Sequence, residues 1–249
     1  MERKEIEKLK NKAKKLRRQV LNLALKKGDG HLGGSFSEIE ILISLYKKVM
    51  KKEDTFILSK GHACYPLYLI LQEKGYSPKV CGHPEIDQKN GISCTTGSLG
   101  HGLPIAVGMA LAKKILKKNG RVYVLMGDGE IQEGTTWESS LVAVHHKLDN
   151  LIVIIDYNKL QALEPLKKVV SFKNLKSLFK EIGYKVLEID GHSFSEIIKA
   201  LNAKTSNRPL MIIANTIKGK GVSFMENNPK WHARRAVFEE VKGAFEELK

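Results

Sequence analysis

The chain reads Arg121-Val122-Tyr123-Val124-Leu125-Met126-Gly127-Asp128-Gly129-Glu130 near its middle. The first part of this stretch is apolar without alternation, which indicates a strand buried on both faces of a parallel sheet. The segment Leu151–Asp156 repeats that pattern. Each predicted strand is followed by a polar side chain, Asp128 after the first and Asn158 after the second. Because parallel strands end at the same edge of a sheet, we expect these two side chains to lie close together.

The glycines on either side of Asp128 permit a tight turn in which backbone amides approach an anion closely. Mg²⁺ prefers oxygen ligands and usually takes one or two protein groups together with phosphate oxygens. The side chains of Asp128 and Asn158, with the carbonyl of Leu160, would suffice. The residues therefore predict a metal-bound diphosphate at this edge. Neither a Walker-type motif nor a Gly-x-Gly-x-x-Gly motif follows the first predicted strand.

A Gly-Asp-Gly turn has a simpler explanation, in which the glycines supply positive φ angles and Asp128 caps the next helix. Two further acids, Glu130 and Glu133, lie just beyond this turn, and a turn needs neither of them. Together with Asn158 they favour the ligand site.

Apolar periodicity divides most of the chain into alternating helices and strands. Helices are predicted at about residues 5–26, from Ser37 onward, at 104–118, 135–146, 174–181 and 195–203, and from Val237 to Leu248; strands are predicted at 56–58, 121–126, 151–156, 185–189 and 210–215. We expect the first helix to end at Gly28 and Ser37 to open a capping box. Small residues in 104–118 suggest close packing against another helix or a second subunit. The pattern predicts one α/β domain over residues 1–249, with a mostly parallel twisted sheet flanked by helices.

Composition narrows the possible functions. The formal charge is +15, from 42 Lys and Arg against 27 Asp and Glu. These cations are spread along the chain without interleaved aromatics, so we expect a solvated surface that attracts anionic substrates and no nucleic-acid partner. Three irregularly spaced cysteines indicate neither a zinc site nor a disulfide framework, and no apolar run approaches the ~20 residues that span a bilayer. A cytoplasmic protein without a membrane partner is the expectation.

Several histidines lie beside glycines in predicted turns, namely His31, His62, His83 and His101. Each by itself could be a surface histidine, but a parallel fold would gather all of them at one rim. Imidazoles there could bind sugar hydroxyls, move protons or bind phosphate. His192 could instead cap a helix or line the site. A last cluster, residues 217–221 with Trp231 and His232, is either a flexible basic loop or a lid that carries His232.

Taken together, these motifs resemble the N-terminal, diphosphate-binding half of transketolase. The resemblance runs from His31 to His232 and rests on an ordered set: Gly-His-Leu-Gly-Gly-Ser, Ser-Lys-Gly-His-Ala, Gly-His-Pro-Glu, Thr-Thr-Gly-Ser-Leu-Gly-His-Gly and Gly-Asp-Gly-Glu-Ile-Gln-Glu-Gly. The Gly-Asp-Gly…Asn element alone is shared by thiamine diphosphate enzymes generally. Two departures are His101, where long transketolases commonly have Gln, and Tyr157-Asn158 in place of Asn-Asn.

The resemblance implies roles for particular residues. It assigns Asp128, Asn158 and Leu160 to a divalent metal, Mg²⁺ or else Ca²⁺ or Mn²⁺. It assigns His62, Gly97, Leu99, Gly127, Asp128, Gly129, Glu130 and Asn158 to thiamine diphosphate. It assigns His31, His83 and His232 to substrate contact and proton transfer, and Glu133 to a carboxylate at a subunit interface. Arg234 and Arg235 are either phosphate ligands or solvated residues.

The resemblance also implies a split enzyme. Single-chain transketolases carry a pyrimidine-binding domain and a C-terminal domain, which this chain has no room for. The expected function is transfer of a two-carbon ketol unit from a ketose phosphate to an aldose phosphate, with a C-terminal partner subunit in an α2β2 assembly. The alternatives are a subunit of another thiamine diphosphate enzyme, of the deoxyxylulose-phosphate synthase or 2-oxo acid dehydrogenase type, or a non-catalytic basic module.

Overall fold

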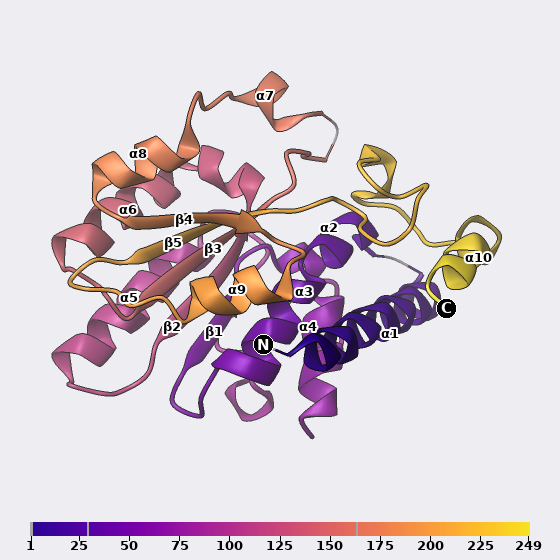
Figure 1. Ribbon diagram of the computed structural model, residues 1–249, viewed down its shortest axis with the longest axis horizontal. Coiled ribbons are helices and arrows are strands. Elements are labelled where there is room, and N and C mark those ends of the chain that lie inside the picture. Colours follow the sequence, from indigo (N-terminus) through magenta and orange to yellow (C-terminus); the bar gives the residue numbers. More distant parts are fainter. Residues whose placement is uncertain (1, 29, 163) are drawn as a thin grey trace.

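The computed structural model describes every residue except Met1, Asp29 and Leu163. Its centre is a five-stranded sheet of order β1-β2-β3-β5-β4, in which every neighbouring pair of strands is parallel (Figure 1). The strands are β1 (Thr55–Leu58), β2 (Val122–Gly127), β3 (Leu151–Tyr157), β4 (Lys185–Asp190) and β5 (Leu210–Asn215). The predicted single α/β domain with a parallel sheet is therefore confirmed.

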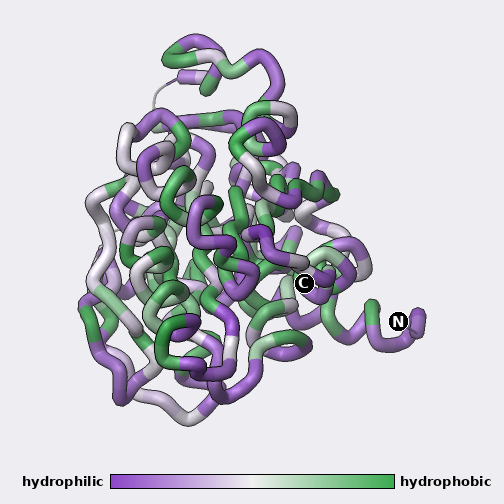
Figure 2. Tube along the Cα trace, turned by 90° about the vertical axis from the view of Figure 1, so that its left-hand side faces the viewer, coloured by the Kyte–Doolittle hydropathy of each residue, from purple (hydrophilic) through white to green (hydrophobic). Residues whose placement is uncertain are grey.

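The central strands are apolar throughout because helices cover both faces of the sheet. On β2, Tyr123 and Leu125 join one core cluster, whereas Val122, Val124 and Met126 join the other. The first cluster lies under α1 (Arg3–Lys27), α3 (Ile39–Ser44), α4 (Tyr65–Glu73), α9 (Phe194–Leu201) and α10 (Phe238–Glu247). The second lies under α5 (Gly102–Ile115), α6 (Gly134–His145) and α8 (Leu175–Ile182). Figure 2 shows the apolar segments gathered in the interior of the molecule. Successive side chains of a strand point to opposite faces of the sheet, and both faces are buried here. The strand sequence is therefore apolar at successive positions rather than at every second one.

The helices are α1 (Arg3–Lys27), α2 (Leu32–Ser37), α3 (Ile39–Ser44), α4 (Tyr65–Glu73), α5 (Gly102–Ile115), α6 (Gly134–His145), α7 (Leu166–Val169), α8 (Leu175–Ile182), α9 (Phe194–Leu201) and α10 (Phe238–Glu247). A π-helical turn, η1 (Leu45–Val49), continues α3, and short 3₁₀ turns lie at η2 (Gly61–Ala63), η3 (Gln88–Asn90), η4 (Asp128–Gln132) and η5 (Pro229–Trp231). As predicted, α1 ends at Gly28, whose φ of 72° is left-handed. None of the described helices combines the length and apolar character needed to span a bilayer.

The region around Ser37 differs from its prediction. The Gly-Gly-Ser stretch is helical as α2, and α3 begins only after a break at Glu38. Ser37 caps nothing; its hydroxyl donates to the Gly34 carbonyl at 3.0 Å and to Asp156 Oδ2 at 2.6 Å. The capping-box prediction is wrong because a buried carboxylate on β3 accepts the hydroxyl that the sequence pattern assigned to a local cap.

Two other outcomes concern helices. Helix α4 was not predicted, since six of its nine residues are buried and it shows no amphipathic stripe. Helix α5, rich in small residues, packs against α6, which agrees with the expectation of a close helix partner. Cys64, Cys81 and Cys94 form no disulfide bond with one another.

A buried cluster of charges lies beneath the C-terminal edge of the sheet. The ammonium of Lys60, after β1, donates to Asp156 Oδ2 on β3 and to the Gly34 carbonyl on α2. Glu38 Oε2 lies 3.2 Å from the same ammonium, yet neither carboxylate oxygen of Glu38 has a hydrogen-bond partner among the described residues. Burial, only partly offset by Lys60, raises the pKa of Glu38 to about 8. Glu38 is therefore largely protonated in the folded chain at neutral pH.

A second buried network anchors the segment after β5. Arg17 on α1 donates two hydrogen bonds to Glu40 on α3, at 2.8 and 2.9 Å. Although burial acts to raise it, Arg17 and His192 lower the pKa of Glu40 to about 2. His192 Nδ1 lies 3.1 Å from Glu40 Oε2, and His192 Nε2 accepts the backbone N–H of Ile217 at 2.9 Å. His192 therefore neither caps a helix nor lines the site; it fixes the start of the segment that carries His232.

The buried face of β3 gives a first prediction. Ile154 is 1% exposed, whereas Ile115 at the end of α5 is 69% exposed. We expect Ile154→Ala to lower the free energy of unfolding by about 2–5 kcal/mol, through lost burial and the cavity left behind. Ile115→Ala, the matched control, should change it by less than about 0.5 kcal/mol. Urea denaturation measures both values, and equal effects would contradict the assignment of the core.

The buried Glu38 carboxyl gives a second prediction. Its pKa rises from the ordinary value of 4.5 to about 8 in the folded state. Between these two pH values the folded chain therefore binds a proton that the unfolded chain has lost. The stability from this proton is complete below the unfolded pKa and is lost as pH rises through the folded pKa. Between about pH 5 and about pH 9 the free energy of unfolding should therefore fall more steeply for the parent chain than for Glu38→Gln.

Urea melts across this pH range provide the measurement. The control is Glu138→Gln, which makes the same change at an exposed position on α6. Parallel pH profiles for the parent chain and Glu38→Gln would show that the carboxyl does not hold its proton in the folded state.

Candidate functional site

Strand register brings the polar turn after β2 beside the turn after β3. Gly127 pairs with Asp156, so Asp128 and Asn158 follow adjacent strands at the same edge of the sheet. The backbone N–H of Lys159 donates to Asp128 Oδ2, which ties the two turns directly. Lys159 has a φ of 66°, a left-handed conformation that turns the chain back across the strand end. The expected proximity of Asp128 and Asn158 is confirmed.

Both side chains and Leu160 line one cavity of about 190 Å³. Asn158 Oδ1 accepts the Leu160 N–H at 3.1 Å, while Asp128 Oδ1 accepts no hydrogen bond from any described residue. One carboxylate, one amide and one carbonyl form a set of hard oxygen donors that fits Mg²⁺ if phosphate oxygens complete the coordination. No group of three or more His, Cys, Asp and Glu in the described part of the chain could hold a metal by itself.

The electrostatics of this cavity also favour a cation at Asp128. Burial, and then the nearby Asp156, raises the pKa of Asp128 to about 7. A buried carboxylate with such a pKa lacks sufficient positive charge around it, and a divalent cation would supply that charge. The residues present therefore fit a metal ion.

The cavity collects most of the predicted ligand residues. Ten of them line it: His62, Leu99, Gly127, Asp128, Gly129, Glu130, Glu133, Asn158, Leu160 and His232. Sequence reasoning missed the other lining residues, which are Gly34, Lys60, Gln132, Gln161, Ala162 and Lys218. Gln161 Nε2 donates to Gln132 Oε1 at 2.6 Å and joins the two turns across the cavity.

Four histidine rings converge at the cavity from distant parts of the chain. The ring centroid of His31 lies 5.1 Å from that of His62, 6.4 Å from that of His83 and 5.6 Å from that of His232. His62 and His232 are 5.3 Å apart. The predicted cluster of His31, His62 and His83 therefore forms, with His232 as its fourth member. His101 makes no ring contact with them; it is exposed before α5, where Nδ1 lies 3.1 Å from the Leu99 carbonyl.

Two of the four imidazoles, those of His62 and His232, are neutral at neutral pH. Burial, followed by the positive charge of Lys60, lowers the pKa of His62 to about 2. Burial, followed by Lys218, lowers the pKa of His232 to about 3. At neutral pH both rings can accept a proton or a hydrogen bond, but they do not bind a phosphate as cations.

Lys218 is the most prominent residue that sequence reasoning left without a role. Its ammonium donates to the Leu160 carbonyl at 2.9 Å and to the Gln161 carbonyl at 3.3 Å, and it lies 2.7 Å from His232 Nδ1. Burial lowers its pKa to about 8, so it is a cation at neutral pH. The only signal in the sequence was its position between the last predicted strand and a glycine. Since a carbonyl oxygen has two lone pairs, the Leu160 carbonyl retains one for a metal.

The two acids beyond the Gly-Asp-Gly turn differ in their surroundings. Glu130 is fully buried, and its carboxylate accepts hydrogen bonds from Ser59 Oγ and from the N–H groups of Gly100 and Gly127. It thereby braces three loops of the site, and its contact with a cofactor remains a prediction. Glu133 is exposed at the start of α6 and makes no ion pair with a described residue. Its role at a subunit interface also remains a prediction.

Glycines allow close approach where the loops meet. A Cβ at Gly97, whose φ is 144°, would lie 3.0 Å from the His83 ring. A Cβ at Gly33 would lie 3.0 Å from Lys218 Cγ, and the Gly33 carbonyl accepts the N–H of Gly219. These contacts explain the glycine at position 33: a side chain there would push away the segment that carries Lys218 and His232. Arg234 pairs with Glu240 and lies over the Trp231 ring.

Proteins similar to this chain are transketolases or transketolase subunits. Residues 9–248 match the family model described as transketolase, thiamine diphosphate binding domain. An apulose-4-phosphate transketolase subunit of Actinobacillus succinogenes is 39% identical, and the match covers 97% of this chain and 96% of that protein. A 6-deoxy-6-sulfo-D-fructose transketolase subunit of Clostridium sp. is 36% identical, with 96% of both chains covered. Human transketolase is 34% identical over 91% of this chain but only 40% of its own length.

Solved structures agree with these relatives. Transketolase from Campylobacter jejuni superposes with a TM-score of 0.86 at 32% identity, and that from Leishmania mexicana with a TM-score of 0.89 at 26% identity. The matches cover 96% and 98% of this chain but 42% and 41% of those longer chains. The chain therefore belongs to the transketolase family, in which it corresponds to the N-terminal, thiamine diphosphate-binding subunit.

Proposed function

We propose that this chain is one subunit of a split transketolase. With thiamine diphosphate and a divalent metal ion, it would transfer a two-carbon ketol unit reversibly from a ketose phosphate to an aldose phosphate. A C-terminal partner subunit would supply the pyrimidine-binding domain, in an α2β2 assembly within the cytoplasm.

The observation that carries this proposal is the meeting of two groups of residues in one place. The turns of Asp128 and Asn158 supply oxygen donors at the end of the sheet, and four imidazoles surround the same cavity. Hard donors suit a metal with a diphosphate. Neutral imidazoles suit the hydroxyl groups of a sugar and the protons that must leave or return to them. A simple structural turn requires neither group.

Thiamine diphosphate, when bound, supplies the chemistry that breaks and forms the carbon–carbon bond beside a ketose carbonyl. The residues of this chain would position the cofactor and the sugar and would transfer protons to and from the sugar. Asp128, Asn158 and the Leu160 carbonyl would hold the metal, and the ammonium of Lys218 would add positive charge beside the diphosphate. His31 and His232 would accept or return the proton of a sugar hydroxyl, and His83, more exposed, would hold the terminal hydroxyl of the two-carbon unit.

Two relatives support the partner and the substrate class. The proteins from Actinobacillus succinogenes and Clostridium sp. are both named as transketolase subunits, one for apulose 4-phosphate and one for 6-deoxy-6-sulfo-D-fructose. Both names describe sugars with a strongly anionic group. The net charge of +15 on this chain would attract an anionic sugar of the same kind.

The metal assignment is tested by substitution of its carboxylate. We expect Asp128→Ala to abolish metal-dependent binding of thiamine diphosphate, because the variant loses the charged ligand among the three oxygen donors. Isothermal titration calorimetry with Mg²⁺, and again with excess chelator, measures this binding. The chelator should reduce binding by the parent chain to the level of the variant.

Asp149→Ala is the matched control, since Asp149 lies before β3 at the opposite edge of the sheet. It should bind thiamine diphosphate like the parent chain. Unchanged affinity of Asp128→Ala, with the chelator also without effect, would remove the metal from the proposal.

The split enzyme is tested by reconstitution. We expect this chain alone to bind thiamine diphosphate weakly and to transfer no ketol unit, because groups on the partner complete the cofactor site. Addition of a protein that carries the pyrimidine-binding domain should restore transfer between ketose and aldose phosphates, as measured by product analysis. Robust turnover by the single chain would contradict the proposal, and condensation that requires pyruvate would assign the chain to a synthase.

A further inference from the structure

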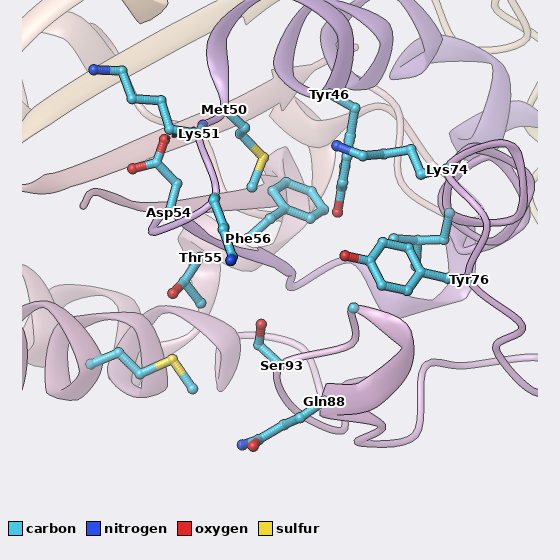
Figure 3. A pocket seen from close by; sticks show the side chains of 14 residues that line it. Tyr46, Met50, Lys51, Asp54, Thr55, Phe56, Lys74, Tyr76, Gln88 and Ser93 are labelled. Carbon is cyan, nitrogen blue, oxygen red and sulfur yellow. Dashed lines mark hydrogen bonds between the residues drawn. The ribbon is translucent and has the colours of Figure 1, made fainter. Parts of the chain in front are cut away.

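A second cavity, of about 580 Å³, lies at the opposite, N-terminal edge of β1. Its walls come from five parts of the chain: the turn η1 with Met50, the stretch from Lys51 to Phe56, the end of α4 with Tyr76, the segment from Gln88 to Ser93, and α5 (Figure 3). Its volume falls in the range of small-molecule sites. The π-helical turn at its edge is a rare element that occurs frequently at functional sites.

The floor of this cavity is apolar and partly aromatic. Phe56 and Leu71 are buried there, and Met50 and Met109 complete the lining. The Tyr46 ring packs edge-on against Phe56, with 5.6 Å between ring centroids. Aromatic faces and flexible thioethers adapt well to a planar ring.

Several hydroxyl groups face this space without a protein partner. The hydroxyls of Tyr46, Tyr76 and Ser93 point into the cavity (Figure 3), and none forms a hydrogen bond with a described residue. Burial, and next the neighbouring Tyr76, raises the pKa of Tyr46, so its phenol remains a donor at neutral pH. Tyr46 and Ser93 are partly buried and Tyr76 is 40% exposed, so the three converging hydroxyls offer hydrogen-bond donors and acceptors to a polar ligand that enters the cavity.

The charges around the cavity are positive. Lys51, Lys52 and Lys74 line it, and none forms an ion pair with a described residue. The Lys74 ammonium lies 5.5 Å from the Tyr46 ring centroid, at the inner side of the rim (Figure 3). The single acid of the lining, Asp54, is already engaged, since its two oxygens accept the N–H groups of Lys51 and Arg121.

We propose that this cavity is a second binding site, for a small molecule of the nucleoside phosphate class. The planar ring would lie on the apolar floor formed by Phe56 and the methionines. The ribose and ring edges would bond the hydroxyls of Tyr46, Tyr76 and Ser93. The phosphate would lie at the lysine rim, near Lys74. This site is separate from the cavity at Asp128, because the two lie at opposite ends of β1 and β2, and it does not depend on the proposed catalytic function.

Adenosine 5′-monophosphate is a suitable probe, titrated by calorimetry into the full chain. Saturating thiamine diphosphate and Mg²⁺ prevent the probe from binding at the Asp128 site. We expect Lys74→Gln and Tyr76→Ala each to weaken binding by at least about tenfold, through loss of a charged contact or of a ring and its hydroxyl. Both residues are exposed at the rim, so the variants should fold normally, as circular dichroism would verify.

Lys118→Gln is the matched control, because Lys118 is an exposed lysine just after α5 that does not line the cavity. Adenosine, which lacks the phosphate, and inorganic phosphate, which lacks the ring and the sugar, should each bind at least about tenfold more weakly than the probe. The proposal is overturned if the parent chain does not bind the probe. It is also overturned if Lys118→Gln weakens binding as much as Lys74→Gln, or if inorganic phosphate binds as tightly as the probe, since unspecific charge would then explain the affinity.

Discussion

The buried ion pair between Lys60 and Asp156 connects the parts of the candidate site. Lys60 follows β1 and precedes His62 by two residues, while Asp156 is the penultimate residue of β3 and precedes Asn158 by two residues. Burial acts to lower the pKa of Lys60, but the charge of Asp156 raises it, and Lys60 in turn lowers the pKa of Asp156, so both partners of the pair stay charged. An ion pair in this environment is costly to separate, because either partner alone would be a buried, uncompensated charge. The imidazole and the metal ligand are thereby held in a fixed relation.

Hydroxyls and a carbonyl complete this pair. Asp156 also accepts hydrogen bonds from Ser37 on α2 and from Thr216 after β5, and Lys60 donates to the Gly34 carbonyl. The network thus reaches α2, next to His31, and the segment that leads to Lys218. A second network, from Arg17 through Glu40 and His192, fixes the same segment from the other side. Charged groups remote from the cavity therefore set the positions of groups inside it.

Positive charge and proton transfer are assigned to different side chains at this site. Lys60 and Lys218 carry the charge, and their presence helps to hold His62 and His232 neutral. A neutral imidazole beside a cation is a proton acceptor that does not compete with the cation for an anion. The opposite edge of the sheet has lysines, tyrosines and an apolar floor but no such histidines. The two cavities therefore suit different chemistry, although both belong to the same parallel sheet.

The sequence by itself determined the parallel sheet, the turns of Asp128 and Asn158 at its C-terminal edge, and three of the four clustered histidines as one group. These features were readable because they depend on local patterns: unbroken apolar runs, glycines in turns, and strands that alternate with helices. The ordered motifs added the family. Such patterns can be recognised without knowledge of contacts between residues that are distant in the sequence.

Only the tertiary structure decided which polar groups of distant residues form hydrogen bonds and ion pairs with one another. Ser37 was expected to cap a helix, but its hydroxyl bonds Asp156, more than a hundred positions away in the chain. No role of their own was assigned to Lys60 and Lys218 from the sequence, where they lie within a motif and a glycine-rich basic cluster, yet both are buried at the site. Helix α4 has no polar face and escaped detection for that reason. A buried charge needs a partner, and the fold can supply that partner from any part of the chain. The spacing of residues along the sequence therefore does not reveal which residues will pair.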